Sequence, residues 1–122
     1  MEQKVSQLNG WFAAQIALCR QREQALLADD RADEAAFEKI RANVYDIFRT
    51  ILDVAVRTGG GDAEAVQRFF ARRMQTIPSG WAEAWEKAVQ HHDPVRMQQE
   101  KIKLDTAAAI KVRFADVWEG AE

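Results

Sequence analysis

Two histidines and an aspartate stand side by side at His91-His92-Asp93, a combination of side chains that metal sites use. Neighbouring residues of a helix project about 100° apart, so the two imidazoles do not converge on one ion. The Glu-x-x-His pattern of helical di-metal proteins is absent, because Ala88 and Val89 stand three positions before the histidines. We therefore predict a turn, with the histidines ending one helix and Asp93 capping the next. Weak metal binding by His91 and His92 stays an open alternative.

Three pairs of carboxylates have helical spacing: Glu83 with Glu86, Asp30 with Asp33, and Asp46 with Asp53. The first two pairs are similar to the Glu-x-x-Glu motif with which all-helical nucleotide pyrophosphatases hold magnesium. The doubled glutamate and the partner motif of that family are missing. A magnesium-dependent enzyme of the all-α type is therefore our third interpretation, behind two that involve no catalysis.

The glycine run 59–61 does not have the pattern of a phosphate-binding loop, which needs a preceding strand and a following Gly-Lys-Ser/Thr. Asp62 follows the run and is a good N-cap, so we interpret the run as a connector between helices. No local signature of Ser/His/Asp or Cys/His catalysis is found, and no cofactor is expected. The chemistry-bearing residues thus name no catalytic or metal-ligating set.

Two further groups of side chains suggest binding rather than catalysis. Arg68 and Arg72 lie one helical turn apart and would pair with phosphate or with a partner's carboxylates. Trp81 and Trp85 have the same spacing and follow Pro78, where a bent helix would open an aromatic pocket. A small-ligand pocket at these tryptophans is our second interpretation.

Composition limits the class of protein. The chain has 122 residues, of which 48% are hydrophobic and 30% charged, as expected of one globular domain spanning 1–122. Its 17 basic and 19 acidic residues show no basic excess, so we expect no nucleic-acid partner. The apolar run 11–19 is too short for a membrane span and is followed by charges without a cleavage site. The single cysteine, Cys19, favours a reducing compartment, and we expect a cytoplasmic location.

The elements that must position these residues are helices throughout. Apolar residues recur with helical spacing over about 3–28, 31–57, 62–92 and 94–119. Four segments of similar length joined by short turns predict an up-down-up-down four-helix bundle, with the third segment kinked at Pro78-Ser79-Gly80. The stretch 27–35 resembles the hairpin turn of tetratricopeptide repeats, although the repeat's Trp, Leu, Gly and Tyr pattern is missing upstream. That resemblance implies two long helical hairpins as an alternative architecture.

The second segment is apolar around most of its circumference between residues 44 and 56. Such a helix is either central in the domain or shared with a partner. Our first interpretation is therefore a non-enzymatic protein that acts through protein contacts, as a homo-oligomer or an accessory subunit. The candidate interface consists of Tyr45, Leu52 and Val56, with a basic rim from Arg68 and Arg72.

One internal similarity connects the two halves of the chain. Glu38-Lys39-Ile40-Arg41 recurs as Glu100-Lys101-Ile102-Lys103, and each stretch lies early in a predicted helix. The match is consistent with two related helical hairpins.

Overall fold

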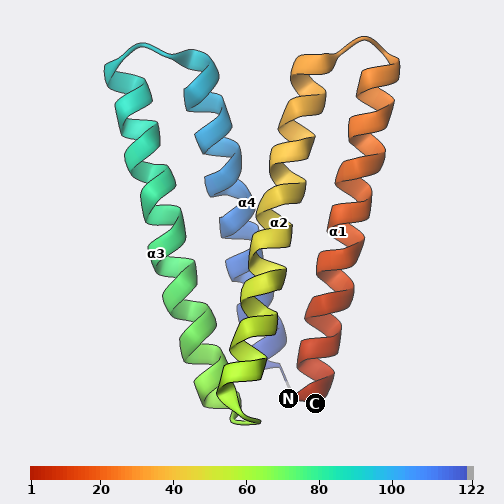
Figure 1. The fold of residues 1–122 in the computed structure, drawn as a ribbon, viewed down its shortest axis with the longest axis vertical. Helices are drawn as coiled ribbons and strands as arrows, with labels where there is room; N and C mark the ends of the chain where they lie inside the picture. Colours follow the sequence, from red (N-terminus) through yellow and green to blue (C-terminus); the bar gives the residue numbers. More distant parts are fainter. Residues whose placement is uncertain (121–122) are drawn as a thin grey trace.

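The computed structural model describes residues 1–120 and shows four helices and no strand in that part of the chain. The helices are α1 (Glu2–Ala28), α2 (Ala32–Gly59), α3 (Ala63–Gln90) and α4 (Pro94–Glu119). Consecutive helices run in opposite directions (Figure 1), and the start of α1 lies close to the end of α4, where Lys4 donates a hydrogen bond to the Trp118 carbonyl. The predicted all-α four-helix bundle is confirmed.

The α1–α2 and α3–α4 connections are three-residue turns of the same kind, 29–31 and 91–93. In each, the amide of the third residue donates to the carbonyl five residues earlier, at 2.8 and 2.9 Å. The middle residue is left-handed in both, with φ of 61° at Asp30 and 53° at His92. This is the hydrogen-bonding pattern of a Schellman helix end. The two hairpins α1–α2 and α3–α4 are thus closed in the same way.

Capping residues start the two helices of the second hairpin. Asp62 accepts a hydrogen bond from the amide of Glu64 at 3.0 Å, and Asp93 accepts one from the amide of Arg96 at 3.0 Å. Asp93 is followed by proline at the first helical position, where the missing N–H costs nothing. Both N-caps and the turn at the histidines lie where the sequence predicts them.

The predicted kink at Pro78 does not interrupt the third helix. α3 continues through 78–80 without a break, and Figure 1 shows no sharp bend there. Pro78 lacks the N–H that would donate to the Met74 carbonyl, so one hydrogen bond is lost. Met74 is buried in the core, and Ile77 and Trp81 are partly buried against it, which holds the helix together on both sides of the proline.

One hydrophobic core joins the hairpins, and it fills only part of the bundle. Phe48 of α2 lies at its centre, with ring centroids 5.9 Å from Phe70 and 6.5 Å from Trp81 of α3. Phe114 of α4 stacks on Phe70 at 4.1 Å. Toward the 29–31 and 91–93 turns, the core ends on the four helices at Cys19, Ala42, Met74 and Ala107.

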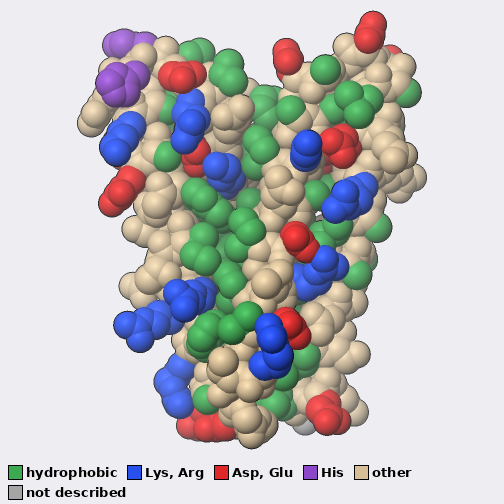
Figure 2. All heavy atoms as spheres, viewed as in Figure 1, with side chains coloured by type: hydrophobic (Ala, Val, Ile, Leu, Met, Phe, Trp, Pro, Cys, Tyr) green, Lys and Arg blue, Asp and Glu red, His purple; other side chains and the backbone are tan. Residues whose placement is uncertain are grey.

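Beyond this limit the hairpins move apart, so that the molecule has the outline of a V (Figure 1). The space-filling view shows a notch between the two arms at the end that carries the histidines (Figure 2). α2 packs against all three other helices, whereas α1 and α3 do not meet. We call the diverging part, residues 20–41 and 82–106, the open end, and the opposite part the closed end.

Candidate functional site

The open end is the candidate site, because there the residues that would continue the core are charged. The side chains of α2 and α4 that face the core recur at alternating spacings of three and four residues. Each core-facing position, or core line, therefore repeats every seven residues, which is about two helical turns. At the closed end these positions are buried and mostly apolar: Tyr45, Phe48, Leu52 and Ala55 on α2, and Ala107, Ile110, Phe114 and Val117 on α4. At the open end the same lines carry Glu38 and Arg41 on α2, and Arg96, Glu100 and Lys103 on α4.

Glu100 is the most deeply buried charged residue described, with 1% of its surface exposed. Its Oε1 accepts hydrogen bonds from Arg96 Nε at 3.0 Å and from Lys103 Nζ at 3.1 Å. Its Oε2 has no hydrogen-bond partner within residues 1–120. Lys103 also lies 6.0 Å from the centre of the Trp81 ring. One carboxylate therefore holds two cations of α4 in place.

Glu38 occupies the equivalent position in the other hairpin, since both glutamates are the seventh residue of their helix. It is 7% exposed, pairs with Arg41, and leaves its own Oε2 without a hydrogen-bond partner in the described residues. On the α1 side it lies beside the Cys19 thiol. The similarity noted between 38–41 and 100–103 thus corresponds to two matching ion pairs, each between a buried glutamate and a partly exposed cation.

The charged residues explain why the hairpins diverge. Arg41 is two turns from Phe48 on the line that faces α3, and Lys103 lies above Trp81, the residue that Phe48 contacts. Closing the bundle would bring cations of both hairpins together and remove them from water. Burying charges costs several kcal/mol per ion unless each is fully paired, so the open arrangement is favoured. The side chains of Arg41, Arg96 and Lys103 are 39%, 56% and 28% exposed.

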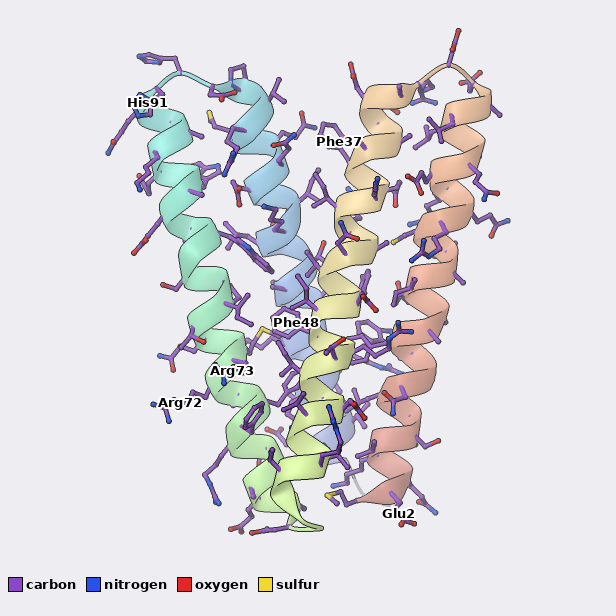
Figure 3. The ribbon with its side chains drawn as sticks, in the orientation of Figure 1. Glu2, Phe37, Phe48, Arg72, Arg73 and His91 are labelled. Carbon is purple, nitrogen blue, oxygen red and sulfur yellow. The ribbon has the colours of Figure 1, made fainter. Side chains whose placement is uncertain are left out.

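An aromatic side chain projects into the space between the arms. Phe37 of α2 points away from α1 toward the other hairpin (Figure 3), and it is only partly buried. It lies on the same face as Phe48, three turns nearer the tip. It is not among the partly buried residues that pack against the core. The inner side of the open end therefore combines an apolar ring with cations.

The predicted interface at Tyr45 and Leu52 is wrong. Tyr45 is 8% exposed and contacts Trp11 edge-on at 5.5 Å, while Leu52 is fully buried. Val56 is partly buried against the core. The wide apolar circumference of 44–56 is covered by the other three helices, because α2 is the central helix of the bundle.

Arg68 and Arg72, the predicted basic rim, are at the surface. Tyr45, Leu52 and Val56 form no exposed apolar patch beside them. Arg68 lies 3.8 Å from Glu64, with both side chains largely exposed. Arg72 is exposed, and Arg73 lies over the Phe69 ring at 5.1 Å. Arg72 and Arg73 extend from α3 into solvent (Figure 3).

Trp81 and Trp85 are both partly buried, at successive turns of α3. Trp81 is partly buried between Phe48 and Lys103, so its ring is already covered on two sides. Trp85 is partly buried one turn further toward the tip. The best-formed concavity borders this region on α3 and α4, and it is lined by other residues: Gly80, Glu83, Ala84, Lys87, Ala88, His91, Asp93 and Arg96.

The histidines and the acidic pairs occupy separate exposed positions. His91 ends α3 and His92 is the left-handed residue of the turn. Asp46 and Asp53 pair with Arg49 and Arg57 on α2. Within residues 1–120 no three His, Cys, Asp or Glu side chains come together in an arrangement that would hold a metal ion.

Burial makes the Cys19 thiol a pH-sensitive part of the structure. Desolvation, and then the neighbouring Glu38 carboxylate, raise the pKa of Cys19 above its ordinary value. The unfolded chain releases this proton at a lower pH than the folded chain, so the free energy of unfolding falls as pH rises above about 8.5. We expect urea denaturation to show a smaller loss between pH 7 and pH 9.5 for Cys19→Ala than for the unaltered chain. An equal loss in both would contradict this origin of the pH dependence.

Comparisons with known proteins add no assignment to this geometry. No family model, curated protein or solved structure matches the chain. Among the described residues, no helix combines the length and the hydropathy needed to cross a membrane.

Sequence reasoning did not identify Phe37, Glu38 or Glu100 as residues of a site. The signal for the glutamates was present in the repeat of 38–41 at 100–103, where an acidic residue precedes a basic one by three positions. Burial of both acids within their hairpins turns that repeat into a structural feature.

Proposed function

We propose that this chain is a non-enzymatic helical-bundle protein that binds another protein chain at its open end, as a homo-oligomer or an accessory subunit. The observation that supports this most directly is the end of the common core halfway along the bundle, with Phe37 projecting between the arms. A partner seated there would cover surface that the two hairpins leave uncovered.

The side chains of the open end are of types that favour such a contact. Completing the burial of one phenylalanine side chain contributes up to about 1.5–3 kcal/mol. Aromatic and arginine side chains are also the residues that most often dominate protein interfaces. Arg41 on α2 and Arg96 on α4 also belong to the open end, and each is paired with a buried glutamate. Positioning of this kind lowers the entropy lost on binding.

A photoreactive phenylalanine analogue at position 37 tests the proposal in the producing cells. We expect a discrete cross-linked product from position 37 on irradiation. The matched control carries the analogue at Val112, which is 62% exposed on the closed half of α4. The proposal fails if position 37 gives no discrete product, or no more than position 112 gives.

We also propose a cytoplasmic location for this activity. The single cysteine is free and buried in the core, and it takes part in no disulfide. A reducing compartment is where an unpaired thiol is most often found.

A further inference from the structure

We propose that the partner at the open end is a second copy of this chain, whose α1–α2 turn enters the space between the two arms. This inference rests on the proposed function and adds the identity of the partner. It is based on the charges that the two hairpins present, on the shape of the arms, and on the matched pairs Glu38–Arg41 and Glu100–Lys103.

The α1–α2 turn is acidic. Asp29, Asp30, Asp33 and Glu34 form what we call the acidic tip, and all four are exposed. Arg31 is the only base within it, and it pairs with Asp29 at 3.7 Å and with Glu34. Asp30 and Asp33 have no ion-pair partner among the described residues. The tip thus carries a net negative charge with two carboxylates available to another molecule.

The space between the arms presents the opposite charge. Arg96 and Lys103 share one oxygen of Glu100, so this cluster has two cations for one carboxylate. Arg41 adds a guanidinium from the facing hairpin, where an arginine keeps further N–H donors after pairing with one carboxylate. Arg96 and Lys103 are about 10.5 Å apart along α4, so they match charges distributed along an element rather than a single small anion. Opposite potentials of this kind guide association and set its orientation.

The arrangement can be reciprocal, because each copy carries both an acidic tip and a notch between its arms (Figure 2). Figure 1 is viewed down the shortest axis and shows the four helices side by side at the open end, so each arm is one helix thick. If the second copy is rotated by about a quarter turn, the dimension of its arm that enters the space between the arms of the first copy is the thickness of a single helix. In a two-fold dimer each copy donates its acidic tip and accepts the tip of its partner, which gives two identical contacts. Phe37 is part of the inserted arm, and it also borders the space that accepts the partner's arm. In this dimer the Phe37 side chain of each copy is therefore covered by the other copy.

Light scattering after size exclusion, over a range of protein and salt concentrations, tests the inference. We expect twice the monomer mass at low salt and dissociation as salt rises, because screening weakens the contact between charges. The variant Asp29→Lys/Asp33→Lys reverses the tip and is expected to weaken dimerisation at least about tenfold. Circular dichroism checks that this variant keeps its helices.

The matched control is Asp46→Lys/Asp53→Lys, which makes the same charge change at two exposed positions of α2 away from the tip. It is expected to dimerise like the unaltered chain. A monomer at every concentration overturns the inference, as does a dimer that the tip variant leaves unchanged. A cross-link from position 37 to a different protein would also overturn it while leaving the proposed function standing. If position 37 gives no discrete cross-linked product, both the proposed function and this inference are contradicted.

Discussion

Replacing Phe48 with alanine is expected to lower the free energy of unfolding by about 3–5 kcal/mol, the usual cost of removing a buried phenylalanine. Phe48 is fully buried, and its ring contacts Phe70 and Trp81 across the boundary between the hairpins. A domain of this size is stable by only about 5–15 kcal/mol, so the variant loses a large part of its stability. Urea denaturation followed by circular dichroism measures the change.

Phe37 provides a matched control on the same face of the same helix. It is partly buried at the open end and is not packed against the core, so Phe37→Ala is expected to cost no more than about 1 kcal/mol. The contrast between the two alanine variants measures how far the common core extends along α2. Similar costs at both positions would show that the open end is packed as tightly as the closed end.

The double variant Arg96→Met/Lys103→Met is expected to cost about 3 kcal/mol, because it leaves the Glu100 carboxylate buried without a cation. Glu100 is the buried member of the cluster, whereas the side chains of Arg96 and Lys103 reach solvent. Adding Glu100→Met removes the unpaired charge. The triple variant is therefore expected to return to within about 1 kcal/mol of the unaltered chain, or to exceed it, since apolar replacements of buried ion clusters are often stabilising.

The control for this series removes two cations from surface pairs. Arg49→Met/Arg57→Met breaks pairs with Asp46 and Asp53, whose side chains are 53% and 68% exposed. Such pairs contribute about 0–1 kcal/mol each, so this variant stays close to the unaltered chain. The account of the buried cluster is contradicted if the double variant is as stable as its control, or if the triple variant is less stable than the double. Urea midpoints at one pH supply all four values.

The helices and their ends follow from local chemistry, and the sequence was sufficient to predict them. Apolar spacing identifies the four helices, and Asp62 and Asp93 accept the N-capping hydrogen bonds expected of them. The turn at His91 and His92 follows from the same reasoning, since adjacent histidines before Asp-Pro suit the end of one helix and the start of the next. These features depend on residues within one turn of each other, so no tertiary information is needed.

Burial was decided by the tertiary structure, and the errors at Tyr45 and Leu52 have this origin. Helical periodicity shows which side chains share a face but not which neighbour covers it. α2 became the central helix, so its wide apolar surface is internal rather than shared with a partner. Packing of Met74 and Trp81 on either side of Pro78 likewise kept α3 continuous where local propensity favours a break.

The sequence by itself determined four helices, the N-caps of α3 and α4, and the repeated Glu-x-x-Arg/Lys pattern at 38–41 and 100–103. Only the tertiary structure decided that both glutamates are buried within their hairpins and that the hairpins diverge beyond Cys19 and Ala107. The physical reason is that the free-energy cost of burying a charged side chain is not set by the sequence alone. That cost depends on how much water the surrounding helices exclude and on which partner lies within hydrogen-bonding distance, and both are properties of the assembled bundle.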